Sequence, residues 1–154
     1  MSLKEQLQAD LKDALRARDE RRKAVIRMAL ADITMAEVER RGELDDADVV
    51  AVLRKQADRR RETIAELRQA NRPDLLANEE HELALLEAYL PQMLSREEIA
   101  AEARQVIAEV LSANPSGAAG PKLLGQVMRP LMQRLKGRAD GTVVNEVVRE
   151  LLAA

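Results

Sequence analysis

Apolar residues recur at every third or fourth position along most of the chain, and no stretch alternates apolar and polar residues with a period of two. The first such stripe consists of Leu3, Leu7, Leu11 and Leu15. It follows Ser2, and Glu5 stands three positions after that serine, which is the pattern of a capping box at a helix start. The helical period predicts amphipathic helices throughout, so the expected fold class is all-α.

Capping residues, glycines and prolines divide this pattern into seven predicted helices. The first six are expected to begin at Ser2, Asp19, Asp45 or Asp46, Pro73, Ser95 and Pro121, and the last covers residues 143–152. We expect Gly42 to end the second helix, because glycine readily takes the left-handed conformation that closes a helix. The third helix should reach about Ala70, Pro130 should kink the sixth, and residues 112–120 should form a loop.

The second capping box, Ser95 to Glu98, follows a proline at position 91, which favours a domain boundary between residues 91 and 94. The sequence therefore predicts a helical N-terminal domain of about four helices over residues 1–93. A C-terminal domain of three helices is expected over residues 94–154.

Composition removes several classes of function. The chain of 154 residues has no cysteine, which excludes disulfides, thiolate zinc sites and thiol nucleophiles. Tyr89 is the only aromatic residue, so base-stacking sheets such as RRM and OB folds are excluded. The longest apolar run, residues 49–53, is far too short to cross a bilayer, and charges in the first turns exclude a signal-peptide core. We therefore expect no membrane span and a cytoplasmic protein.

Candidate catalytic and metal-binding residues are few. His81 stands among Glu79, Glu80 and Glu82, but neighbouring helical positions point apart, so a solvated acidic face is favoured over a metal site. Two of the four serines are needed as helix caps and two lie in the predicted loop, and the glycines lack the spacing of a phosphate cradle. We expect no catalytic residues, no metal and no cofactor.

Charge is nearly balanced over the whole chain, at −2, but it is distributed unevenly. Arginines in the first two thirds are interspersed with acids, which is typical of solvated helix faces with pairs at i and i+4. Residues 121–139 instead contain five basic residues and no acid: Lys122, Arg129, Arg134, Lys136 and Arg138. Such a patch serves either phosphate contact or surface solubility, and the residues alone leave both open.

The motif Leu135-Lys136-Gly137-Arg138-Ala139-Asp140-Gly141 resembles the GatB/YqeY family, and specifically the free-standing YqeY-like proteins. Residues 125–128, 86–91 and 144–145 carry the same resemblance. It implies an N-terminal helical domain and a three-helix domain similar to the tail of the B subunit of the glutamine-dependent tRNA amidotransferase. In that enzyme the tail helps to hold tRNA, while the chemistry lies in other domains. The family link also carries a carbon–nitrogen ligase activity with glutamine as amide donor, which no catalytic residue of this chain supports.

The resemblance and the basic patch together give a set of candidate residues. For RNA binding they are Lys122, Arg129, Arg134, Lys136, Arg138 and Asn145, and for the structural turn they are Gly137, Asp140 and Gly141. Asp140 has two candidate roles, as the cap of the last helix or as an RNA contact. We expect a non-catalytic accessory protein that contacts tRNA. The alternative is a helical adaptor that docks on an amidotransferase or another protein without touching RNA.

Overall fold

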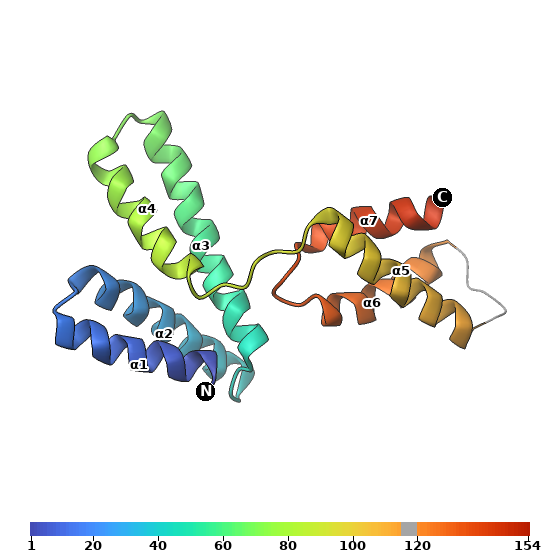
Figure 1. Cartoon of the computed structure of the whole chain (residues 1–154), viewed down its shortest axis with the longest axis horizontal. Coiled ribbons are helices and arrows are strands. Elements are labelled where there is room, and N and C mark those ends of the chain that lie inside the picture. Colours follow the sequence, from blue (N-terminus) through green and yellow to red (C-terminus); the bar gives the residue numbers. More distant parts are fainter. Residues whose placement is uncertain (115–119) are drawn as a thin grey trace. The chain divides into compact units, whose positions relative to one another are not determined.

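The computed structural model describes residues 1–114 and 120–154, and these residues form helices and no strand, so the predicted all-α class is confirmed. The helices, labelled in Figure 1, are α1 (Leu3–Ala17), α2 (Glu20–Arg40), α3 (Asp46–Gln69), α4 (Pro73–Glu87), α5 (Arg96–Ala113), α6 (Pro121–Arg134) and α7 (Gly141–Ala153). The chain divides into two compact units, Met1–Pro91 and Gln92–Ala154. No helix in the described ranges is both long enough and apolar enough to cross a membrane.

Helix starts follow the sequence signals closely. The side chains of Ser2, Asp19, Asp45 and Ser95 each accept a hydrogen bond from the backbone N–H three residues later. Ser2 and Ser95 form complete capping boxes, in which the glutamate at the third helical position bonds back to the serine N–H. Pro73 and Pro121 occupy first turns, where the missing amide proton costs no helical hydrogen bond. Predicted starts are therefore confirmed because they depend on local chemistry.

Helix ends differ from the prediction in one respect. Three non-glycine residues, Arg18, Arg41 and Asn71, take the left-handed conformation at the ends of α1, α2 and α3. At each end the next amide bonds back across the last turn, as Gly42 does to the carbonyl of Glu37 at 3.1 Å. The expectation that Gly42 would supply the left-handed residue is wrong. Arg41 takes that conformation, and Gly42 only donates the closing hydrogen bond.

The N-terminal unit contains two helical hairpins, which Figure 1 shows as α1 beside α2 and α3 beside α4. Its core is formed where the first half of α3 meets the other helices. The fully buried side chains there include Leu7 of α1, Ile26 and Ile33 of α2, Leu53 of α3 and Leu86 of α4. The 24 residues of α3 give a helix about 36 Å long, which allows its first half to pack on α2 while its length also pairs with α4.

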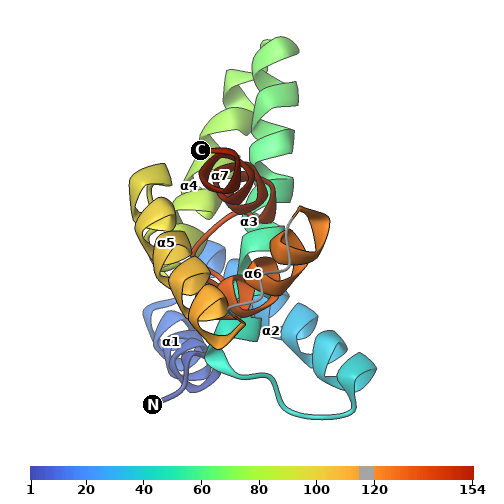
Figure 2. The ribbon, with the colours of Figure 1, turned by 90° about the vertical axis from the view of Figure 1, so that its right-hand side faces the viewer.

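The C-terminal unit packs its three helices around a second core. In Figure 2, which looks nearly along α7, the helices α5 and α6 lie on either side below it. The buried residues are Ile99, Ala103, Val106, Val127, Leu131, Leu135, Val144, Val147 and Val148. Their helical spacing explains why the valine pairs of α7 form a helix although valine favours strands. Helix α5 continues to Ala113, so the predicted loop begins two residues too early, and residues 115–119 of that loop lie outside the described part of the chain.

Each unit holds its own end of the connecting segment. The guanidinium of Arg54 on α3 donates a hydrogen bond to the carbonyl of Pro91 at 2.8 Å. The amide of Leu94 donates to the carbonyl of Arg138, also at 2.8 Å, in the turn between α6 and α7. The turn that carries the family-like motif is therefore fixed to the beginning of the C-terminal unit.

Candidate functional site

The exposed side of α6 carries the first part of the predicted basic patch. Lys122, Gly125, Gln126, Arg129 and Pro130 line a shallow groove with a volume of about 600 Å³. Their spacing of three, four, seven and eight places them on one helical face, while Val127 and Leu131 on the opposite side are buried. The amphipathic pattern that builds the core of this unit thus also presents the two basic side chains to solvent.

Gly125 opens the middle of this face. A Cβ built on Gly125 has no atom within 4 Å, so packing inside the unit does not require a glycine. In a helix interior glycine costs about 1 kcal/mol relative to alanine. Its position between Lys122 and Arg129 leaves the α6 backbone accessible at the centre of the groove.

Two of the basic residues on α6 differ from the third in their partners. Lys122 and Arg129 are exposed and have no acidic partner within the described ranges. Arg134 instead contacts α5, where its guanidinium lies 3.2 Å from Glu109 and 3.5 Å from Glu102. It also donates to the side-chain oxygen of Gln105 at 3.3 Å. The structure therefore brings Lys122 and Arg129 together on one face and directs Arg134 to a neighbouring helix.

The turn after α6 holds the remaining predicted residues. Gly137 has φ of 78°, a left-handed conformation that glycine takes without the steric cost other residues pay, so the turn favours glycine there. Gly141 has no such preference: it begins α7, and a Cβ there would meet Met132 at an ordinary 3.6 Å. Lys136 and Arg138 are both exposed on this turn.

Asp140 precedes α7 and Asn145 lies in its first turns. The carboxylate of Asp140 accepts a hydrogen bond from the amide of Thr142 at 2.7 Å, so its predicted role as the helix cap is confirmed. The side-chain oxygen of Asn145 accepts a hydrogen bond from Nε of Arg149 at 2.6 Å. An amide group that accepts through its oxygen presents its NH₂ as a donor, which is the end that an anion would contact.

Arginines of the N-terminal unit mostly face acids on other helices. Arg22 lies near Asp10, Arg40 near Asp48 and Arg68 near Glu80. The expectation of mixed-charge faces is confirmed, but pairs between helices are more prominent than the expected pairs at i and i+4. His81 is exposed, and the described residues contain no cluster of three metal-ligating side chains.

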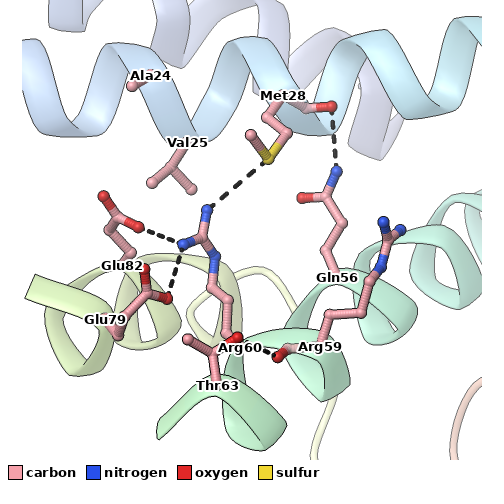
Figure 3. Close-up of a pocket in the computed structure, with 9 residues that line it drawn as sticks. All are labelled: Ala24, Val25, Met28, Gln56, Arg59, Arg60, Thr63, Glu79 and Glu82. Atoms are coloured by element: carbon pink, nitrogen blue, oxygen red, sulfur yellow. Dashed lines mark hydrogen bonds and ion pairs between the residues drawn. The ribbon is translucent and has the colours of Figure 1, made fainter. Parts of the chain in front are cut away.

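Arg60 is the most enclosed of these arginines, since its side chain is only 13% exposed. It lies in a pocket between α2, α3 and α4, and Figure 3 shows it pointing toward Glu79 and Glu82 of α4. Its Nη1 atom contacts both carboxylates. In the sequence Arg60 stands at a position of the apolar stripe of α3, and this pairing explains how a charge is accommodated there.

Comparison with known proteins gives relatives among fungal proteins named "Altered inheritance of mitochondria protein 41, mitochondrial". The Lachancea thermotolerans protein is 34% identical over 113 residues, which cover 71% of this chain and 60% of that protein. The Eremothecium gossypii protein is 34% identical over 152 residues, covering 96% of this chain and 79% of the relative. The Pyrenophora tritici-repentis protein is 30% identical over 149 residues, covering 96% and 80%. The chain thus spans about three fifths of the length of the first of these relatives.

The names of these relatives contradict the location expected from the sequence. All three are named as mitochondrial proteins, whereas the sequence favoured the cytoplasm. That expectation came from charges in the first turns, which exclude the apolar core of a secretory signal peptide. They do not exclude other kinds of targeting segment, and such segments decide the compartment. The cytoplasmic expectation is therefore wrong.

The family is shown by a match over almost the whole chain. The model of the family described as "Yqey-like protein" matches residues 4–152, which include both units and the turn between α6 and α7. The resemblance carried by the motif at residues 135–141 is thereby confirmed, and similarity to the amidotransferase tail remains a general family link. The chain belongs to the Yqey-like protein family.

Proposed function

We propose that the C-terminal unit binds RNA, and tRNA in particular, as part of a non-catalytic accessory protein. The observation that carries this proposal is the exposed face of α6, where Lys122 and Arg129 flank the open Gly125 and have no acidic partner among the described residues. Phosphate groups are the ligand that a one-signed basic face attracts most strongly. Because Gly125 has no Cβ, a nucleic-acid backbone can approach α6 closely at that position.

The turn extends this face with further donors. Lys136 and Arg138 are exposed beside α7, and the amide group of Asn145 lies in its first turns. Arg134 contributes less, because binding a phosphate would require it to leave Glu102 and Glu109. With Tyr89 as the only aromatic residue, and that in the other unit, recognition depends on backbone charge and shape.

A filter-binding assay with total tRNA at low salt tests the proposal. The double substitution Lys122→Glu with Arg129→Glu should weaken binding at least tenfold, since it replaces two attractive contacts by repulsion. The matched control is Arg16→Glu with Arg68→Glu, which makes the same charge change on exposed arginines of the N-terminal unit. The proposal fails if both double variants lose affinity equally, or if neither loses it.

A second candidate is the protein adaptor, and one observation favours it. Helix α2 exposes Met28, Met35 and Val38, with 55%, 62% and 72% of their surface accessible. A large apolar side chain in water is unfavourable, and a row of them along a helix is typical of surfaces that meet another protein. The partner in this second candidate is an amidotransferase or another protein.

Ribonuclease separates the two candidates. The adaptor predicts a partner that co-purifies with the full chain after ribonuclease treatment and is lost with Met35→Glu. RNA binding predicts that Met35→Glu leaves tRNA affinity unchanged, because Met35 lies in the other unit. A tRNA affinity that falls with Met35→Glu contradicts the assignment of RNA contact to the C-terminal unit alone.

A further inference from the structure

The pocket around Arg60 contains a buried hydrogen-bond acceptor without a partner. It has a volume of about 360 Å³ and is lined by residues of α2, α3 and α4 in the N-terminal unit. Gln56 is only 4% exposed, and its Oε1 atom has no hydrogen-bond partner among the described residues. In Figure 3 this oxygen points into the space between Gln56 and Arg60. A buried polar atom of this kind is costly, and a donor that reached it would remove that cost.

The orientation of the Gln56 amide is fixed by its other end. Nε2 donates to the backbone carbonyl of Met28 at 3.1 Å and to the carboxylate of Asp32 at 2.6 Å. Rotating the amide by half a turn would set its oxygen against these two oxygens. Oε1 therefore points away from these two oxygens and toward Arg60 (Figure 3), and no flip of the side chain can satisfy it.

Arg60 places a hydrogen-bond donor with only a weak acceptor near Oε1 of Gln56. Gln56 and Arg60 are four residues apart on α3, so both side chains leave the same helical face. Nη1 of Arg60 is used by Glu79 and Glu82, whereas Nη2 contacts only the thioether of Met28 among the described residues, with a nitrogen–sulfur distance of 4.0 Å. Sulfur is a weak acceptor. The pocket thus presents an acceptor and an under-used donor next to each other.

This pair is complementary to a carboxamide, which carries a donor and an acceptor side by side in one plane. Arg59 and Arg60 face three carboxylates, those of Asp32, Glu79 and Glu82, so the local charge is −1 and an anionic ligand is repelled. An ammonium cation could donate to Gln56 but offers no acceptor to Nη2 of Arg60, whereas a carboxamide offers both. Ala24, Val25 and Met28 supply an apolar wall for a short stem. Oε1 of Gln56 has less than 1 Å² of accessible surface, so a ligand reaches it only when a side chain of the pocket wall moves. Met28 is more than half exposed, so its side chain can move outward.

We propose that this pocket binds a primary carboxamide, with the amide N–H donating to Gln56 and the amide oxygen accepting from Nη2 of Arg60. The source is either an asparagine or glutamine side chain of a partner protein or a small free amide. This inference goes beyond the proposed RNA function, because it concerns a different unit and a different ligand.

Nuclear magnetic resonance titration of the full chain tests the proposal. Propionamide should shift the Met28 methyl signal and the Gln56 side-chain NH₂ signals in a saturable way, with a dissociation constant of about 1 mM for so small a ligand. Butanone has the same shape and keeps the carbonyl but lacks the donor, so it should bind at least tenfold more weakly. Equal binding of the two, or the absence of saturable shifts at tens of millimolar, overturns the proposal and leaves a water-filled pocket.

Two substitutions test the protein side of the same contact. Gln56→Met removes the acceptor at similar size, and Arg60→Lys keeps the charge facing Glu79 and Glu82 but removes Nη2. Each should weaken propionamide binding about tenfold, while the neighbouring control Arg61→Lys, on the exposed side of α3, should change it less than twofold. Unchanged affinity in Arg60→Lys contradicts the assignment. If Gln56→Met does not fold, the comparison of propionamide with butanone on the native chain tests the same acceptor.

The source of the carboxamide is decided by a third probe. A blocked asparagine, N-acetyl-asparagine N-methylamide, adds peptide backbone to the same group. Affinity at least tenfold above that of propionamide supports the pocket as a site for a protein side chain. Affinity at or below that of propionamide supports it as a site for a small amide.

Discussion

The hydroxyl of Tyr89 donates a hydrogen bond to the carboxylate of Asp10, 79 residues earlier in the chain. Arg22 of α2 lies 3.7 Å from the same carboxylate. The segment that follows α4 is thereby attached to both α1 and α2. The only aromatic residue of the protein therefore closes the N-terminal unit, and it offers a spectroscopic reporter for that unit.

The ionisation of Tyr89 is the first prediction. Burial raises the pKa of Tyr89 to about 12, and the hydrogen bond to Asp10 and the charge of Asp10 act in the same direction. Because the unfolded tyrosine loses its proton near pH 10, the unfolded state binds fewer protons between pH 10 and 12. The free energy of unfolding should fall across that window. Absorbance of tyrosinate should show a midpoint near 12 in the native protein and near 10 in denaturant.

The variant Asp10→Asn provides the control for this titration. It keeps a hydrogen-bond acceptor but removes the negative charge, so the native midpoint should move toward 10 without reaching it, since burial remains the largest cause. A native midpoint at 10 in the unmodified protein would show that the hydroxyl is not held as described.

Arg60 and Arg61 form a matched pair for stability. The side chain of Arg60 is 13% exposed and faces two glutamates, whereas that of Arg61 is 45% exposed and pairs with Asp58 and Glu87 at the surface. Arg60→Ala leaves partly buried carboxylates without their partner and should lower the free energy of unfolding by about 2 kcal/mol. Arg61→Ala should cost less than about 1 kcal/mol. Urea unfolding followed by circular dichroism measures both, and equal costs would contradict the enclosed position of Arg60.

The left-handed residues at the helix ends predict stabilising substitutions. Arg18 and Arg41 have φ of 55° and 59°, where a side chain other than glycine costs about 1 kcal/mol. Arg18→Gly and Arg41→Gly should therefore each raise the melting temperature. Lys12→Gly, at an exposed position inside α1, should lower the free energy of unfolding by about 1 kcal/mol. A loss of stability in both end variants would show that these ends do not rely on the left-handed conformation.

Asp140 allows the cap of α7 to be separated from RNA contact. Asp140→Ala should cost about 1 kcal/mol and speed hydrogen exchange at the amides of the first turn of α7, including Thr142. Asp140→Asn keeps an accepting oxygen, so it should preserve both protection and tRNA affinity. A tRNA affinity that changes in the asparagine variant while protection stays normal would assign Asp140 a direct role at the interface.

The sequence predicts those parts of the fold that depend on neighbouring residues. Capping boxes at Ser2 and Ser95 and prolines at 73 and 121 mark helix starts because their hydrogen bonds span only three or four positions. The end of α2 is less predictable. Arg41 takes the left-handed conformation there, although this costs energy for a residue other than glycine. The sequence instead predicts that the adjacent Gly42 takes it.

The candidate site shows the same limit more clearly. Counting charges along residues 121–139 places Arg134 with Lys122 and Arg129, yet its acidic partners come from Glu102 and Glu109 on α5. The unpaired Oε1 of Gln56 cannot be predicted from the sequence either, because only the packing shows that no donor in the described ranges reaches it. Long-range partners decide which charges remain available, and they become visible only in three dimensions.

The salt dependence of tRNA binding decides whether Lys122 and Arg129 on α6 neutralise RNA phosphates, as we propose. Removing one phosphate contact should reduce the slope of the logarithm of the association constant against the logarithm of salt concentration by about 0.7 to 0.9. Lys122→Ala with Arg129→Ala should therefore make the slope shallower by about 1.4 to 1.8. A slope identical to that of the native chain would contradict the proposed role of these two residues.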